Sequence, residues 1–123
     1  MEIQRLVTNI CAKKLEQSKA FYTSLLNFKV NFDSDWFVQL VSVGKEFELG
    51  LIQEGHEIVP ERARGKIKGG YITFVVDNVD DLFLKAQELN CNILQSPEPT
   101  PYGQKRMLIE APEGTVCDIS SPM

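Results

Sequence analysis

The stretch KGGYITFVVDNVDDLFLKAQELNCNI, residues 68 to 93, decides the fold because its pattern occurs twice in the chain. Its apolar residues first alternate as in a β-strand, and from Val79 onward they recur at helical spacing. The stretch RLVTNICAKKLEQSKAFYTSLLNFKV, residues 5 to 30, has the same order of strand and helix. The sequence therefore predicts two copies of one structural unit.

The two copies can be aligned residue by residue. In their first strands, Val7 corresponds to Tyr71. Near their ends, each copy has a glycine four residues before an acidic residue, which aligns Gly44 with Gly114 and Glu48 with Asp118. The spacing between matched residues changes only where loops differ in length. Internal repeats of this kind cannot bury their apolar faces alone, so each copy should complete its core with a neighbour.

Hydrophobic periodicity predicts an α+β fold made of two tandem βαβββ modules within a single domain, residues 1–123. Module one covers about 1–53, a polar linker with Pro60 and Gly65 covers about 54–68, and module two covers about 69–123. Asn78 is placed to cap the second helix, whereas Lys14 occupies the equivalent position of the first. We expect helices at 15–25 and 79–89, strands at 4–11, 28–32, 36–41, 47–52, 71–76, 91–95, 105–110 and 115–120, and a Pro-rich loop at 96–103.

Composition indicates an ordinary globular protein of the cytoplasm. The chain has 123 residues, 43% of them hydrophobic and 24% charged, and no run approaches the roughly 20 apolar residues that cross a bilayer. The start of the chain lacks the features of a secretory signal. Its net charge of −4 disfavours nucleic-acid and membrane partners. Cys11, Cys91 and Cys117 are too few and too scattered for a disulfide framework or a thiolate zinc site.

Three segments resemble the vicinal-oxygen-chelate superfamily of glyoxalases, bleomycin-resistance proteins and extradiol dioxygenases. They are LEQSKAFYTSLLNFKV, FVVDNVDDLFLKAQELN and GQKRMLIEAPEGTVCDIS, and the chain is closest in type to the bleomycin-resistance-like members. The resemblance implies that each module curls its mixed sheet into a half-barrel, with the helices outside and a cupped site inside. It also implies a homodimer.

The resemblance further implies four metal-ligand positions, which fall at Val7, Glu48, Tyr71 and Asp118. Valine cannot bind a metal, and a phenol is a poor ligand unless deprotonated. A divalent cation prefers three or more good protein ligands, and the only histidine, His56, lies in the linker. A two-histidine, one-carboxylate iron site is therefore excluded within one chain. We expect no cofactor, and a divalent metal is possible but disfavoured.

Period-two alternation predicts which strand residues face the cup. Glu48 and Gly50 should face it, while Phe47, Leu49 and Leu51 face the helix. The expected ligand-binding residues are Val7, Asn9, Trp36, Glu48, Tyr71, Tyr102, Arg106 and Asp118. Other residues expected on the same faces are Val38, Thr73, Val75, Leu108, Val116 and Ser120.

Each candidate also has a structural interpretation. Glu48 and Asp118 could be strand carboxylates in salt bridges, with Arg106 as a candidate partner. Trp36 and Tyr102 could pack at the sheet rim, and Tyr71 could close the cup with its hydroxyl bonded to a carboxylate. His56 is most simply a solvated loop residue.

Two classes of function follow. The first is a small-molecule-binding protein that sequesters an aromatic or cationic compound without a catalytic metal, because aromatic walls and carboxylates suit such a ligand. The second is a lyase or isomerase with Glu48 or Asp118 as base and Tyr71 as acid, with or without an atypically bound divalent metal. The incomplete ligand set favours the first class.

Overall fold

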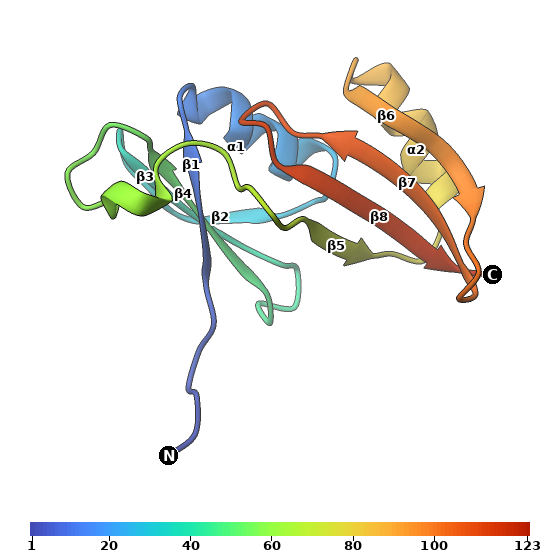
Figure 1. Cartoon of the computed structure of the whole chain (residues 1–123), viewed down its shortest axis with the longest axis horizontal. Coiled ribbons are helices and arrows are strands. Elements are labelled where there is room, and N and C mark those ends of the chain that lie inside the picture. The colour runs from blue at the N-terminus through green and yellow to red at the C-terminus, as the bar shows by residue number, and fades with distance from the viewer. The chain divides into compact units, whose positions relative to one another are not determined.

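The computed structural model describes residues 1–123, which form two helices and eight strands in two compact units (Figure 1). The units, Met1–Lys66 and Ile67–Met123, are described separately. The first contains β1 (Thr8–Ala12), α1 (Leu15–Ser24), β2 (Lys29–Asp33), β3 (Phe37–Val41), β4 (Glu48–Gln53) and a 3-10 turn (Glu61–Ala63). The second contains β5 (Ile72–Val75), α2 (Val79–Glu88), β6 (Asn92–Pro99), β7 (Gln104–Glu110) and β8 (Val116–Pro122).

Both units have the same βαβββ topology. Their four-stranded sheets have the orders β1-β4-β3-β2 and β5-β8-β7-β6. In each, the first strand pairs in parallel with the last, and the remaining pairs are antiparallel. The predicted α+β fold with two tandem modules is therefore confirmed, and both sheets are open rather than closed into a barrel.

The core of each unit lies between one sheet face and its helix. In the first unit, α1 packs on β3 and β4, and in the second, α2 packs on β6, β7 and β8. Burying one such apolar side chain contributes about 1.5–3 kcal/mol, so this face fixes the register of each strand. The buried strand residues are Ile10, Ala12, Val38, Leu40, Leu49 and Leu51 in the first unit and Met107, Ile109, Cys117 and Ile119 in the second.

The helix starts differ as the sequence predicts. Asn78 accepts hydrogen bonds from the backbone N–H groups of Asp80 and Asp81 and thereby caps α2. Lys14 makes no side-chain cap at the start of α1. Neither helix is long and apolar enough to span a membrane.

Three expectations about the strands of the first unit are wrong. Val38, expected in the cup, is fully buried because β3 begins at Phe37 and directs Val38 and Leu40 toward α1. Phe47 lies in the turn before β4 and is 67% exposed, so it does not face the helix. Strand β1 begins at Thr8 rather than residue 4.

The predicted Pro-rich loop is shorter than expected, because β6 continues to Pro99. Pro97 is tolerated there because it falls in an irregular part of the β6–β7 pairing, between Gln95 and Glu98. Strand β6 is also at the edge of its sheet, where one side of the backbone has no partner strand.

The polar segment after β4 folds against the first unit. Val59 is buried, Cys11 Sγ donates to the carbonyl oxygen of Ala63 at 3.5 Å, and Arg64 donates to the carbonyl oxygen of Glu54 at 2.9 Å. The boundary between the units falls after it, between Lys66 and Ile67.

Candidate functional site

Each sheet has a second face, opposite its helix, where most of the candidate residues lie. In the first sheet, Gly50 of β4 pairs with Asn9 of β1 on one side and Gln39 of β3 on the other. Alternation places Phe37 and Glu48 on the same side of the sheet. We call this set, Asn9, Phe37, Gln39, Glu48 and Gly50, the open face of the first sheet.

A polar network is centred on Glu48. Arg5 donates from Nε to Oε2 and from a terminal nitrogen to Oε1, both at 2.6 Å. Gln39 Nε2 donates to Oε1 at 2.6 Å, and Gln39 in turn accepts from Asn31 Nδ2 at 2.9 Å. The Arg5 hydrogen bonds, with a smaller contribution from Gln39, lower the pKa of Glu48, whereas partial burial acts in the opposite direction. Glu48 is therefore a firmly ionised carboxylate.

Glycine at position 50 allows a close approach over the sheet. A Cβ atom there would lie 2.2 Å from Asn9 Oδ1 and 3.1 Å from Phe37 Cε1. Real Cβ atoms do not tolerate the first distance, so the Asn9 amide lies against the Gly50 backbone in a space that only glycine leaves free.

Aromatic rings continue from the open face to the adjoining turn. Phe37 lies 6.1 Å from Phe32 and 5.7 Å from Trp36, measured between ring centroids. The Trp36 ring stacks on His56 at 3.9 Å with an interplanar angle of 12°. His56 is therefore a packed ring rather than the solvated loop residue expected from sequence.

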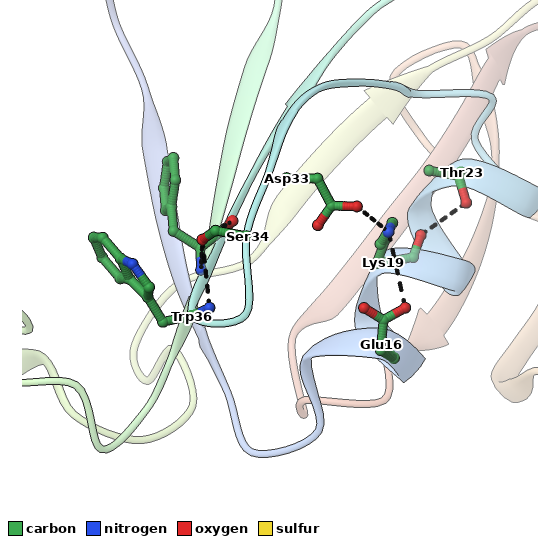
Figure 2. A network of polar contacts seen from close by, with 7 residues as sticks. Glu16, Lys19, Thr23, Asp33, Ser34 and Trp36 are labelled. Atoms are coloured by element: carbon green, nitrogen blue, oxygen red, sulfur yellow. Dashed lines mark hydrogen bonds and ion pairs between the residues drawn. The ribbon is translucent and has the colours of Figure 1, made fainter.

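The turn before β3 holds Trp36 in place, as Figure 2 shows. Ser34 Oγ accepts from the backbone N–H groups of Trp36 and Phe37 at 3.4 and 3.0 Å. At the end of β2, Asp33 forms an ion pair with Lys19 of α1, which also lies 3.8 Å from Glu16. The Ser34 contacts join the turn to the start of β3, and the Asp33 ion pair joins the end of β2 to α1.

The second sheet has its own carboxylate centre at Asp118, which is 3% exposed. Asp118 accepts from Thr73 Oγ1 at 2.9 Å and from the Ser120 hydroxyl. Arg106 Nε lies 3.4 Å from Asp118 Oδ1, and its guanidinium carbon lies 5.5 Å from the centre of the Tyr71 ring. The salt-bridge interpretation of Asp118 with Arg106 is thus realised, with Tyr71 completing a cation–π contact.

Within each unit the structure brings some predicted residues together and leaves others apart. Asn9 and Glu48 share the open face of the first sheet, and Tyr71, Arg106 and Asp118 form one cluster in the second. Val7 lies just before β1 and is half-buried, Trp36 lies in the turn before β3, and Tyr102 lies in the β6–β7 turn, 62% exposed.

Sequence reasoning missed Arg5 and Gln39, the two donors to Glu48, and Thr73 and Ser120 as donors to Asp118. Alternation places Thr73 and Ser120 on the correct face, but it does not indicate hydrogen bonds. Arg5 precedes β1, where no pattern in the sequence ties it to β4.

Metal-binding residues are not assembled within either unit. No group of three or more His, Cys, Asp and Glu side chains is arranged to hold an ion. Glu48 and Asp118 each have an arginine beside them instead.

The family model described as the Glyoxalase/Bleomycin resistance protein/Dioxygenase superfamily matches residues 3–119. A search of curated proteins gives no significant match.

Several solved structures share the fold at low sequence identity. TnmS3, an antibiotic binding protein from Streptomyces sp. CB03234, aligns with a TM-score of 0.80 and 22% identity over 100% of this chain and 99% of that one. TioX from Micromonospora sp. ML1 aligns with a TM-score of 0.77 and 15% identity, covering 98% and 99%. The lactoylglutathione lyase from Agrobacterium tumefaciens aligns with a TM-score of 0.73 and 17% identity, covering 95% and 92%.

Proposed function

The chain belongs to the glyoxalase/bleomycin resistance protein/dioxygenase superfamily, and we propose that it is a small-molecule-binding protein that sequesters an aromatic or cationic compound without a catalytic metal. The observation that carries the proposal is an ionised carboxylate, Glu48, on the same open face as the ring of Phe37. Charge and a flat apolar surface are what such a compound requires.

The contacts at the family's metal-ligand positions support the metal-free part of the proposal. Val7 offers no donor atom, and both oxygens of Glu48 accept hydrogen bonds from Arg5. Asp118 accepts from two hydroxyl groups and has Arg106 beside it. Two carboxylates that are already hydrogen-bonded are fewer than the three or more good protein ligands that a divalent ion prefers, so these residues do not fit one.

The same contacts disfavour the lyase or isomerase alternative for Glu48. A general base works best with a pKa near the operating pH, whereas Arg5 lowers the pKa of Glu48 below its ordinary value. A binding role is also consistent with the likeness to TnmS3, which is an antibiotic binding protein.

We further propose that the protein acts in the cytoplasm as a homodimer. Strands β1, β2, β5 and β6 are at the edges of their sheets, and each edge presents unpaired backbone groups that a second copy can cover. Light scattering at micromolar concentration should give the mass of two chains, and the mass of one chain would contradict the dimer.

Native mass spectrometry with metal analysis of the purified protein is the first test. We expect a retained small molecule or an empty protein, and substoichiometric metal. Near one equivalent of tightly held zinc, nickel, manganese or iron per chain would overturn the metal-free assignment.

Calorimetry with an identified ligand is the second test. Replacing Trp36 with Ala should weaken binding by roughly 1–3 kcal/mol, the range for removing a stacked aromatic surface. Trp36→Phe, which retains a flat ring, is the matched control and should lose less. A ligand that binds Trp36→Ala and Glu48→Gln as tightly as the parent would place the site elsewhere.

A further inference from the structure

The two partners in the Arg5–Glu48 pair are held very differently. Glu48 belongs to β4 and its side chain is only 13% exposed, whereas the Arg5 side chain is 60% exposed. Arg5 comes from residues 1–7, which precede β1 and extend beyond it (Figure 1). The acceptor is therefore fixed by the sheet, and the donor is carried by a segment outside it.

Glu48 is also held by side chains of its own sheet. Asn31 donates to Gln39 Oε1, and this directs the Gln39 amide nitrogen toward Glu48 Oε1. Asn31 and Gln39 lie on β2 and β3, so the carboxylate is positioned by side chains of the sheet itself. A carboxylate prepared in this way is ready to bind a cation before the cation arrives.

The geometry of the Arg5 contact identifies the kind of cation that fits. Two nitrogens on one planar group donate to the two carboxylate oxygens, each at 2.6 Å. An amidinium or guanidinium group presents the same pair of parallel donors, whereas an ammonium group does not. On the same open face the Phe37 ring lies over Gly50, two residues along β4 from Glu48, and Phe32 lies next to Phe37.

We propose that Arg5 is an internal occupant of a recognition site for planar amidinium or guanidinium compounds, and that an aryl-amidine or aryl-guanidine displaces Arg5 from Glu48. The inference rests on the proposed binding function and specifies its ligand class. The two N–H donors of the ligand's planar cation replace the two donors of Arg5 at Glu48, and the ligand's aromatic ring lies toward Phe37.

An internal occupant reduces the apparent affinity of the ligand. Apparent affinity falls in proportion to the fraction of molecules whose site is free, so removing Arg5 should strengthen binding. Because the Arg5 side chain is largely exposed, its ion pair is weak, and the expected gain is about 3- to 10-fold. Removing the charge of Glu48 should have the opposite effect.

Benzamidine and its neutral counterpart benzamide are suitable probes, used in NMR titrations of the isotope-labelled full chain. Benzamidine should bind Arg5→Gln about 3- to 10-fold more tightly than the parent and Arg5→Lys with intermediate affinity. It should bind Glu48→Gln at least about 10-fold more weakly, since a charge-assisted pair is lost. Arg62→Gln removes the same charge from an exposed position elsewhere and should match the parent. Benzamide should show no dependence on either Arg5 or Glu48.

Equal benzamidine affinity for the parent and Arg5→Gln would overturn the inference, as would undiminished binding to Glu48→Gln. If other aromatic compounds still bind in a Trp36-dependent manner, the proposed binding function survives that result. If neither benzamidine nor any other compound binds, both the inference and the proposed function fail.

Discussion

The side-chain amide of Asn9 lies so close to the backbone of Gly50 that a Cβ atom on Gly50 would be 2.2 Å from Asn9 Oδ1. The two residues are paired across β1 and β4, the parallel pair that joins the first strand of the module to its last. Their contact therefore connects the strand pairing that defines the module to the open face where the proposed site lies.

Gly50→Ala should destabilise the protein by about 1–3 kcal/mol, the usual cost of inserting a methyl group into occupied space. Urea denaturation would measure the change in the free energy of unfolding. The double variant Asn9→Ala, Gly50→Ala should recover part of the loss, because the closest obstruction has been removed and neighbouring substitutions are not additive. Parental stability of Gly50→Ala would show that Asn9 moves aside at no cost.

The two helix starts provide a matched pair of substitutions. Asn78→Ala should cost about 1 kcal/mol of stability, because two backbone N–H groups at the start of α2 lose their acceptor. Lys14→Ala should be nearly neutral, since Lys14 makes no cap at the start of α1. Thermal unfolding of both variants would measure this difference. Equal effects would contradict a specific role for the Asn78 cap.

Sequence alone predicts the elements well because their apolar residues keep the period of the structure that buries them. The helix after Asn78 and the acidic strands at Glu48 and Asp118 are examples. The orientation of β3 is not predictable in this way, since five consecutive residues from Phe37 to Val41 are mostly apolar and fit either face. Only packing against α1 decides that Val38 is buried.

The contacts of the candidate site were less predictable because they depend on strand register. Tyr71 and Asp118 are both expected to face the cup, yet the residue paired with Asp118 is Thr73, two residues after Tyr71. A displacement of two residues along a strand keeps a side chain on the same face but gives it a different neighbour. The Arg5 contact depends on a segment outside the sheet, for which alternation gives no information.

Asp118 should contribute to stability as well as to the site. Asp118→Ala is expected to cost about 1–3 kcal/mol, because Thr73 and Ser120 lose a buried acceptor and Arg106 loses its neighbouring charge. Exposed Asp77 offers a control, and Asp77→Ala should change stability little. Chemical denaturation would compare the two, and similar small effects would show that the Asp118 cluster is not stabilising.

The Arg5–Glu48 pair should make stability depend on pH in the acid range. Hydrogen bonding to Arg5 lowers the folded-state pKa of Glu48 below its ordinary value of 4.5, so the folded protein holds this carboxylate ionised more strongly than the unfolded chain does. The resulting stabilisation is fully present above pH 4.5 and disappears as the pH falls through the lowered pKa. Glutamine at position 48 cannot titrate, and most of the same contribution is lost in Arg5→Gln because Arg5 is the main cause of the shift. Urea midpoints of the parent should therefore exceed those of both variants by a constant amount at neutral pH and converge with them below pH 4.5.

Added salt should narrow the neutral-pH difference, because the Arg5 side chain is largely exposed and its charge is screened. A difference that stays constant down to the most acidic pH at which the protein remains folded would show that Arg5 does not bind Glu48 in solution.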